Sequence, residues 1–283
     1  MAALEPRPCG EVDTRSEAST LGMGLYPPRA DPHPKNASHF STSPQGGGDA
    51  KALPPKSRLT IIPTSRYNTL MSDHRTQSRM APARQKLLDA ALAVIREKGY
   101  VATTVDELCA RAGVAKGSFF HHFDDKEALA VAAAHYWSQT TGAFFAEAPY
   151  HLHEDPLDRV LGYIDFRRAI LTGEVPDFTC LVGTMVQEVY GSHPAIRDAC
   201  DASISGHAEK IETDIAAAMK LRRIRARWTA GSLALHTQAV LQGAFILAKA
   251  KGGADIAISS VDHLRRYIEL LFQSPARKGR KAS

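Results

Sequence analysis

The stretch "TTVDELCARAGVAKGSFFHHFDDKEAL", residues 103–129, contains two short segments with helical apolar spacing, separated by very little chain. Thr104, followed three residues later by Glu107, predicts a helix N-cap with a capping box, and Gly113 predicts the end of that helix. A second short helix is predicted over 115–123. Two short helices joined by a glycine-containing turn are typical of a helix-turn-helix unit.

The helix predicted over 115–123 has two different faces. Phe119 and Phe123 are four residues apart, so they are predicted to lie on one buried face. The outward face carries side chains that can donate hydrogen bonds to phosphates and base edges, namely Lys116, Ser118, His121 and His122. Lys116 begins this helix and Lys126 begins the next, which places a cation beside each helix N-terminus. This pattern favours a nucleic-acid partner.

The neighbouring segments are also helical in pattern. Apolar residues spaced by three and four, closed by Lys98 and Gly99, predict a first helix over 83–98. Asp124 or Asp125 is expected to cap a long helix that ends near residue 146. Residues 75–120 contain eight basic and four acidic residues, so they carry +4 of the chain's net charge of +5. The basic character of the chain is therefore concentrated around the helix-turn-helix unit.

The segment "ARQKLLDAALAVIREKGYVATTVDELCARAGVAKGSFFHHFDDKEAL" (83–129) resembles the DNA-binding domain of the TetR family of bacterial transcriptional regulators. The resemblance covers about residues 82–137. It implies an all-α protein, with an N-terminal three-helix helix-turn-helix DNA-binding domain followed by a helical ligand-binding and dimerisation domain. The DNA-contacting residues that it implies are Thr104, Lys116, Gly117, Ser118, Phe120, His121, His122 and Lys126. Phe120 departs from the tyrosine of many relatives, and it can offer only apolar contact, such as to a thymine methyl.

The chain divides by composition. Residues 1–80 hold ten of the sixteen prolines and the run Gly46–Gly48, so we expect a disordered extension, with translation from Met71 or Met80 as an open alternative. We expect the helix-turn-helix domain over 81–127, the ligand-binding and dimerisation domain over 128–274, and a basic disordered tail over 275–283.

Several functional classes are disfavoured. The four cysteines show no CxxC or metal-ligand spacing, and the adjacent His121 and His122 point about 100° apart on a helix, so we predict no metal site. No GxSxG, P-loop or Rossmann fingerprint occurs, which predicts neither an enzyme nor a cofactor. No apolar run approaches the roughly 18–20 residues that span a bilayer. We therefore expect a cytoplasmic protein that does not enter membranes.

The C-terminal half is predicted to form helices over 156–172, 177–190, 194–221, 227–250 and 256–273. The last of these has an apolar stripe at offsets 0, 3, 7 and 10, and the helix before it has a broad apolar surface. The family resemblance implies that the last two helices form a four-helix interface between subunits. The expected residues of a homodimer interface are Leu233, Val240, Val261, Leu264, Ile268 and Leu271.

The segment "DFTCLVGTMVQEVYGSHPAIRDACDASI" (177–204) interleaves large apolar, small and polar residues. Such a pattern suits the wall of an apolar ligand cavity, and core packing explains it equally well. With two aromatic residues of the preceding long helix, the candidate ligand-binding residues are Trp137, Phe144, Phe178, Cys180, Met185 and Gln187.

Together these features predict a DNA-binding transcriptional regulator. We expect a homodimeric repressor, with double-stranded operator DNA and a small-molecule effector as its partners. Two alternatives remain open at this point. One is a repressor that responds to oxidants or electrophiles through Cys180. The other is a helical enzyme or carrier with no role at DNA.

Overall fold

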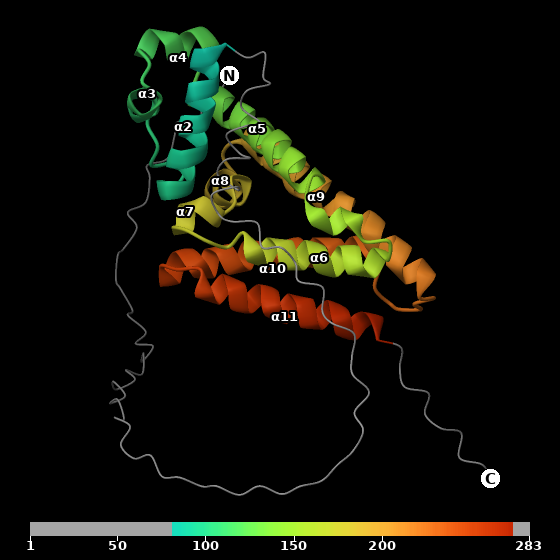
Figure 1. The fold of residues 1–283 in the computed structure, drawn as a ribbon. Helices are drawn as coiled ribbons and strands as arrows, with labels where there is room; N and C mark the ends of the chain where they lie inside the picture. Colours follow the sequence, from blue (N-terminus) through green and yellow to red (C-terminus); the bar gives the residue numbers. More distant parts are fainter. Residues whose placement is uncertain (1–80, 274–283) are drawn as a thin grey trace, which may run out of the picture. The chain divides into compact units, whose positions relative to one another are not determined.

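The computed structural model describes residues 81–273, and all regular structure in that range is helical (Figure 1). The helices, labelled as in Figure 1, are α2 (Pro82–Lys98), α3 (Val105–Ala112), α4 (Lys116–His122), α5 (Lys126–Ala146), the short 3-10 helix η2 (Pro149–Leu152), α6 (Pro156–Ala169), α7 (Val175–Phe178), α8 (Leu181–Val189), α9 (Pro194–Leu221), α10 (Ala230–Lys251) and α11 (Asp255–Phe272). The predicted all-α class is confirmed. Our predictions for residues 1–80 and for the tail over 275–283 lie outside the described residues.

Most predicted helix ends lie within one or two residues of the observed ones, but α6 ends at Ala169 instead of 172 and α10 begins at Ala230 instead of 227. Local capping accounts for the ends of α3, and two further features differ from the prediction. Thr104 Oγ1 accepts a hydrogen bond from the Glu107 backbone N–H at 3.2 Å, and Gly113 ends α3 with a φ of 63°. The Glu107 carboxylate pairs with Lys98 instead of completing the capping box. The helix predicted over 177–190 is divided into α7 and α8, because the chain is extended at Thr179 and Cys180, and Cys180 caps a new helix.

The helix-turn-helix unit is built around a small apolar core. Leu87 of α2, Leu108 of α3 and Phe119 of α4 are fully buried, and Phe123 is 5% exposed, as the spacing of the two phenylalanines predicts. This core continues into α8 and α9, where Met185 belongs to the same cluster. The helix-turn-helix unit and the first part of the C-terminal half therefore share one packed interior.

The rest of the C-terminal half packs around a second core. Helix α10 lies beside both α9 and α11, and α6 contacts α9 and α11 (Figure 1). Ile164, Ile215 and Leu241 from α6, α9 and α10 are all at most 1% exposed. Among the helices within 81–273, none combines the length and the apolar character that crossing a membrane requires.

Of the six residues that we expected at the dimer interface, four lie inside their own subunit, and for the other two the interface role stays a prediction. Leu233, Val261, Leu264 and Ile268 are at most 3% exposed and lie in the core of their own subunit, while Val240 and Leu271 are half-buried against that core. An apolar stripe shows that a helix face is buried, but it does not show whether the subunit or a partner covers it. The exposed large apolar residues of α10 and α11 are Leu235, Ile246, Leu247, Tyr267 and Leu270.

Candidate nucleic-acid interface and internal cavity

Helix α4 presents a continuous exposed surface. Lys116, Gly117, Phe120 and His121 are exposed, and at about 100° per residue they cover an arc of about 140° on the helix. Ser118 and His122 are half-buried and lie outside this arc, as does the buried Phe119. The ring of Phe120 is 51% exposed and meets the Phe119 ring edge-on at 5.2 Å between centroids. The arc therefore combines a cation, a backbone without a side chain, an apolar ring and an imidazole.

Two of the candidate DNA contacts lie where α3 and α4 begin. Lys116 Nζ forms an ion pair with Asp106 Oδ1 at 2.8 Å, and both side chains are more than half exposed. This contact raises the pKa of Lys116, because the hydrogen bond and the charge of Asp106 favour the ammonium form. Thr104 is exposed at the N-cap of α3, where its hydroxyl accepts from the backbone and retains a hydrogen for donation. Both groups can thus donate to an anionic oxygen.

Lys126 is placed differently from the other candidates. Its ammonium donates to the backbone oxygens of Tyr100, at 3.1 Å, and of Thr103, at 2.9 Å, and lies 4.3 Å from the centre of the Tyr100 ring. Burial lowers the pKa of Lys126. The side chain fastens the loop between α2 and α3 to the start of α5, a role that the sequence could not show because its partners are backbone carbonyls more than twenty residues away. A phosphate contact by Lys126 remains a prediction.

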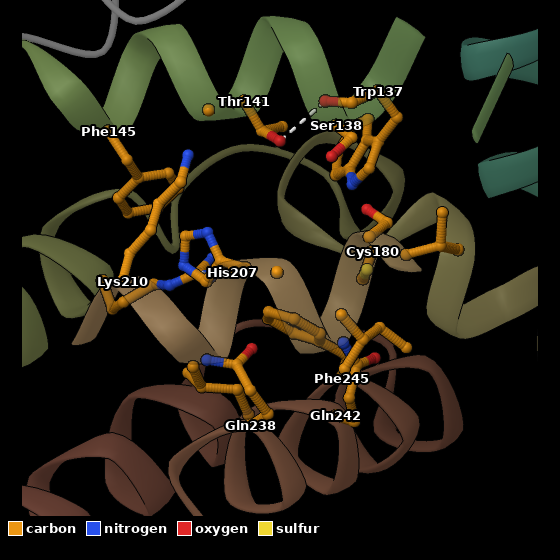
Figure 2. A pocket seen from close by; sticks show the side chains of 17 residues that line it. Trp137, Ser138, Thr141, Phe145, Cys180, His207, Lys210, Gln238, Gln242 and Phe245 are labelled. Atoms are coloured by element: carbon orange, nitrogen blue, oxygen red, sulfur yellow. Dashed lines mark hydrogen bonds between the residues drawn. The ribbon is translucent and has the colours of Figure 1, made fainter. Parts of the chain in front are cut away.

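A cavity of about 200 Å³ lies in the C-terminal half (Figure 2). Figure 2 shows side chains of α5, among them Trp137 and Phe145, on one side and side chains of α10, among them Gln238 and Phe245, on the other. His207 of α9 lies on the wall between them. A second cavity, of about 380 Å³, shares the lining residues Gly142, Phe145, His207 and Lys210 with the first.

The candidate ligand-binding residues divide into two groups. Trp137 and Cys180 line the first cavity, and Gln187 lines a small pocket that it shares with Cys180. Phe144, Phe178 and Met185 pack in the core and line none of these three spaces, so a ligand contact by any of them remains a prediction. An alternation of residue types cannot separate a cavity wall from a packed interior, because both are apolar.

Sequence reasoning missed the polar part of the cavity. Arg167, His207, Lys210 and Gln238 line it, and the sequence does not set them apart from the other polar residues of their helices. Gln238 and Gln242, four residues apart on an otherwise apolar stretch of α10, were the available signal, because a buried amide needs partners. Gln238 is 5% exposed and its Nε2 donates to Tyr163 Oη at 3.3 Å.

The His207 ring is held in one protonation state. Its Nε2 lies 2.9 Å from Arg167 Nη2 and 3.0 Å from Tyr163 Oη. A guanidinium has no acceptor, so His207 Nε2 must carry a lone pair towards Arg167, and the ring hydrogen is on Nδ1. Burial and the positive charges of Arg167 and Lys210 lower the pKa of His207 to about 2. The ring is therefore neutral at physiological pH.

The cavity wall also touches the helix-turn-helix unit. The guanidinium of Arg96 in α2 lies 5.3 Å from the centre of the Trp137 ring, and its Nη1 donates to the Asp177 backbone oxygen at 3.2 Å. Glu188 Oε2 of α8 accepts from the Val101 backbone N–H, in the loop between α2 and α3, at 2.9 Å. Helix α8 also contributes Val182 to the cavity. A shift of α5 or α8 at the cavity would therefore be transmitted to α2 and to the loop before α3 through these contacts.

Comparisons with known proteins agree with this arrangement. Residues 87–133 match the family described as "Bacterial regulatory proteins, tetR family", and residues 156–264 match "Tetracyclin repressor-like, C-terminal domain". The HTH-type transcriptional regulator YvkB of Bacillus subtilis (strain 168) is 32% identical over 78 residues, which are 28% of this chain and 41% of that protein. The HTH-type transcriptional repressor KstR2 of Rhodococcus jostii (strain RHA1) is 46% identical over 46 residues, 16% of this chain and 22% of that protein. The chain thus spans less than half the length of these two curated relatives.

Solved structures extend the similarity to both halves. The crystal structure of a TetR transcriptional regulator from Chloroflexus aurantiacus J-10-FL is 27% identical, has a TM-score of 0.59, and is matched over 66% of this chain and 94% of that one. The shared fold therefore includes the cavity-bearing half as well as the helix-turn-helix unit.

Proposed function

The chain belongs to the TetR family of bacterial regulatory proteins, and we propose that it is a homodimeric repressor that binds operator DNA and is released when a small molecule fills the cavity. The observation that carries the proposal is the exposed arc of α4 on a helix-turn-helix unit. Lys116, Gly117 and His121 lie together on this arc, above a fully buried Phe119.

In this proposal α4 is the recognition helix and enters the major groove. Lys116 exchanges Asp106 for a guanine edge or a phosphate, and Gly117 allows the backbone to approach closely. Phe120 contributes apolar contact, such as to a thymine methyl group. Thr104 donates its hydroxyl to a phosphate from the start of α3.

We assign the dimer interface to the exposed apolar residues of α10 and α11. The two helices lie side by side (Figure 1). The ring of Tyr267 meets that of His236 at 5.2 Å between centroids, which links their outer faces. Leu235, Leu247 and Leu270 are 44–64% exposed in the single chain. A two-fold axis would bury the same patch on both subunits and would relate the two α4 helices, which then read half-sites about one helical turn or a multiple apart.

Release by a ligand would act through the contacts between the cavity and α2. A molecule in the cavity would press on Trp137, which contacts Arg96, and on α8, whose Glu188 holds the loop before α3. To change the bound fraction from 1:99 to 99:1, the ligand must favour the DNA-incompetent conformation by about 5.5 kcal/mol. Operator DNA must then weaken ligand binding by the same factor.

The test is fluorescence anisotropy with duplexes taken from the DNA that flanks the gene for this chain. A dimer that makes about 6–10 phosphate contacts should lose about 10³–10⁵ in affinity between 50 and 200 mM salt. Lys251→Ala, at the end of α10, is the control for Lys116→Ala because it removes a cation far along the chain from α4. If no duplex binds at low salt, the regulator proposal fails and an enzyme or carrier without a DNA role is favoured.

Cys180 gives a second mode of release. It is half-buried, lines the cavity, and its Sγ accepts from the Gly183 backbone N–H at 3.4 Å. Cys180→Ser should keep the response to a reversible ligand and abolish only the response to an oxidant or electrophile. Release of the wild type by thiol-reactive compounds alone would assign the sensing role to this thiol.

A further inference from the structure

The charges on the cavity wall are unbalanced. The seventeen residues that line the cavity of about 200 Å³ include two cations, Arg167 and Lys210, and no aspartate or glutamate. His207 does not change this balance, because its Nε2 accepts from Arg167 and the ring is neutral. A partly buried positive charge without a counter-charge is unfavourable, so such a wall favours an anionic occupant.

Arg167 retains hydrogen-bond donors for such an occupant. Its Nε donates to Tyr163 Oη at 2.9 Å and its Nη2 to His207 Nε2 at 2.9 Å, and both acceptors are neutral. These contacts use two of the five N–H groups, and among the described residues no carboxylate pairs with this guanidinium. Its plane also lies over Phe145, 4.3 Å from the ring centre. Arg167 is thus held in place with its charge uncompensated.

Other half-buried arginines of this half show the contrast. Arg159 pairs with Asp214, Arg222 with Asp155 and Arg265 with Asp165, each at 2.7 Å. The fold therefore supplies a carboxylate where an arginine serves structure alone. Arg167 has no such carboxylate partner among the described residues, and it lines the cavity.

Lys210 provides a second cation at the same end of the cavity. Figure 2 shows its side chain beside Phe145 and His207. Its Nζ would lie 3.2 Å from a Cβ atom built on Gly142, so the missing side chain at Gly142 leaves room for the ammonium group. No ion pair joins Lys210 to another residue between 81 and 273.

The remainder of the wall selects the body of the ligand. Trp137, Phe145, Leu241 and Phe245 supply apolar and aromatic surface. The volume of about 200 Å³ is below the roughly 300–1,000 Å³ of sites for drug-sized molecules, so the part of the occupant that this cavity holds is small. A planar carboxylate matches the two-pronged geometry of a guanidinium, and a single charge suits a wall that is otherwise largely apolar.

We propose that this cavity binds a small organic carboxylate with an aromatic or other apolar body, held at its charged end by Arg167 and Lys210. The assignment of the carboxylate as the effector rests on the proposed function, whereas its binding does not. The neighbouring cavity of about 380 Å³ adjoins the same charged end through His207 and Lys210, so it gives room for a substituent.

The test is calorimetric titration of the full chain without DNA. The probes are benzoate, phenylacetate, cinnamate and hexanoate, each compared with its neutral primary amide, and inorganic phosphate. At least one carboxylate should bind about 10- to 100-fold more tightly than its amide and than phosphate. Binding by none of the carboxylates, equal affinity for acid and amide, or equal affinity for phosphate would overturn the proposal.

Variants locate the site. Arg167→Gln should reduce carboxylate affinity about 10- to 100-fold and leave amide binding unchanged. Lys210→Gln should also reduce carboxylate affinity, and because Lys210 is exposed, this variant is less disruptive to the fold. Arg168→Gln is the matched control, because this neighbouring arginine is exposed and pairs with Asp262 outside the cavity. Unchanged carboxylate affinity in a folded Arg167→Gln or Lys210→Gln protein would contradict the proposed anchors.

A separate anisotropy assay with operator DNA distinguishes the two proposals. A carboxylate that binds and releases the DNA supports both. One that binds without releasing the DNA supports the carboxylate site and removes its role as the effector.

Discussion

Replacing His207 by glutamine should make the fold less sensitive to acid. The wild-type ring is held neutral by burial and by the nearby positive charges of Arg167 and Lys210, which lower its pKa to about 2. The Tyr163 hydroxyl, the other polar group at Nε2, donates to that nitrogen, because Nε2 carries a lone pair and no hydrogen. In the unfolded chain the same ring takes up a proton near pH 6.5. Acid therefore stabilises the unfolded state relative to the folded one at this position.

The size of the effect follows from proton linkage. The contribution of His207 to stability is fully present above the unfolded pKa of about 6.5 and is lost progressively as the pH falls towards the folded value of about 2. Between pH 7 and pH 5 the wild type should lose about 2 kcal/mol of unfolding free energy through this residue. Because the ring is partly exposed, this value is an upper limit.

The measurement is urea unfolding at pH 7 and pH 5, at one protein concentration, for the wild type, His207→Gln and the exposed-histidine control His135→Gln. The loss between the two pH values should be smaller in His207→Gln by up to about 2 kcal/mol and unchanged in His135→Gln. If His207→Gln loses as much stability as the wild type, the ring is not held neutral and the hydrogen-bond assignment at Nε2 is wrong.

Three further predictions distinguish the functions of residues that the sequence analysis placed in one group. Lys116→Ala should weaken operator binding about 10- to 100-fold more than binding to random duplexes in anisotropy, with little effect on the free energy of urea unfolding. Lys126→Ala should weaken binding to both duplexes alike. It should also lower the free energy of unfolding by about 1–3 kcal/mol, because its contacts with two backbone carbonyls are lost. Leu270→Glu should give folded monomers in sedimentation, whereas Leu264→Glu should give unfolded or insoluble protein; a dimeric Leu270→Glu variant would place the interface elsewhere. Trp137→Leu should retain most of its carboxylate affinity in calorimetry but should release less operator DNA in anisotropy. Full release by this variant would show that the Trp137–Arg96 contact does not transmit ligand binding to α2.

The sequence predicted the DNA-binding unit well because its signals are local. Thr104 could be predicted as the N-cap of α3, because its hydroxyl can accept a hydrogen bond from a backbone N–H of the first turn. Gly113 could be predicted as the end of α3, because glycine readily adopts the left-handed conformation found there. The four-residue spacing of Phe119 and Phe123 correctly indicated the buried side of α4. Each of these features depends on residues within one turn of helix.

The cavity and the interface could not be predicted in the same way, because they depend on contacts between distant residues. Arg167 and His207 are forty residues apart, and only the packing of α6 against α9 brings their nitrogens within hydrogen-bond distance. The stripe through Leu264 and Ile268 gave the correct periodicity for α11, yet the surface that it faces is the subunit's own core. Periodicity defines a buried face, and only the tertiary structure identifies what covers it.

The positions of the anchors imply that affinity and release are controlled by different residues. Arg167 and Lys210 lie on α6 and α9, and their contacts in the charged end of the cavity are with Tyr163, His207 and Phe145 rather than with α2. A carboxylate would gain similar energy from them in both conformations, and equal affinity for two states shifts neither. Trp137 is the lining residue whose ring contacts α2, through Arg96. In the proposed release mechanism, the difference in affinity therefore comes from the apolar part of the ligand, acting through Trp137 or through the α8 residues of the wall. Molecules with the same charged group but different apolar parts should then range from full effectors to competitive antagonists.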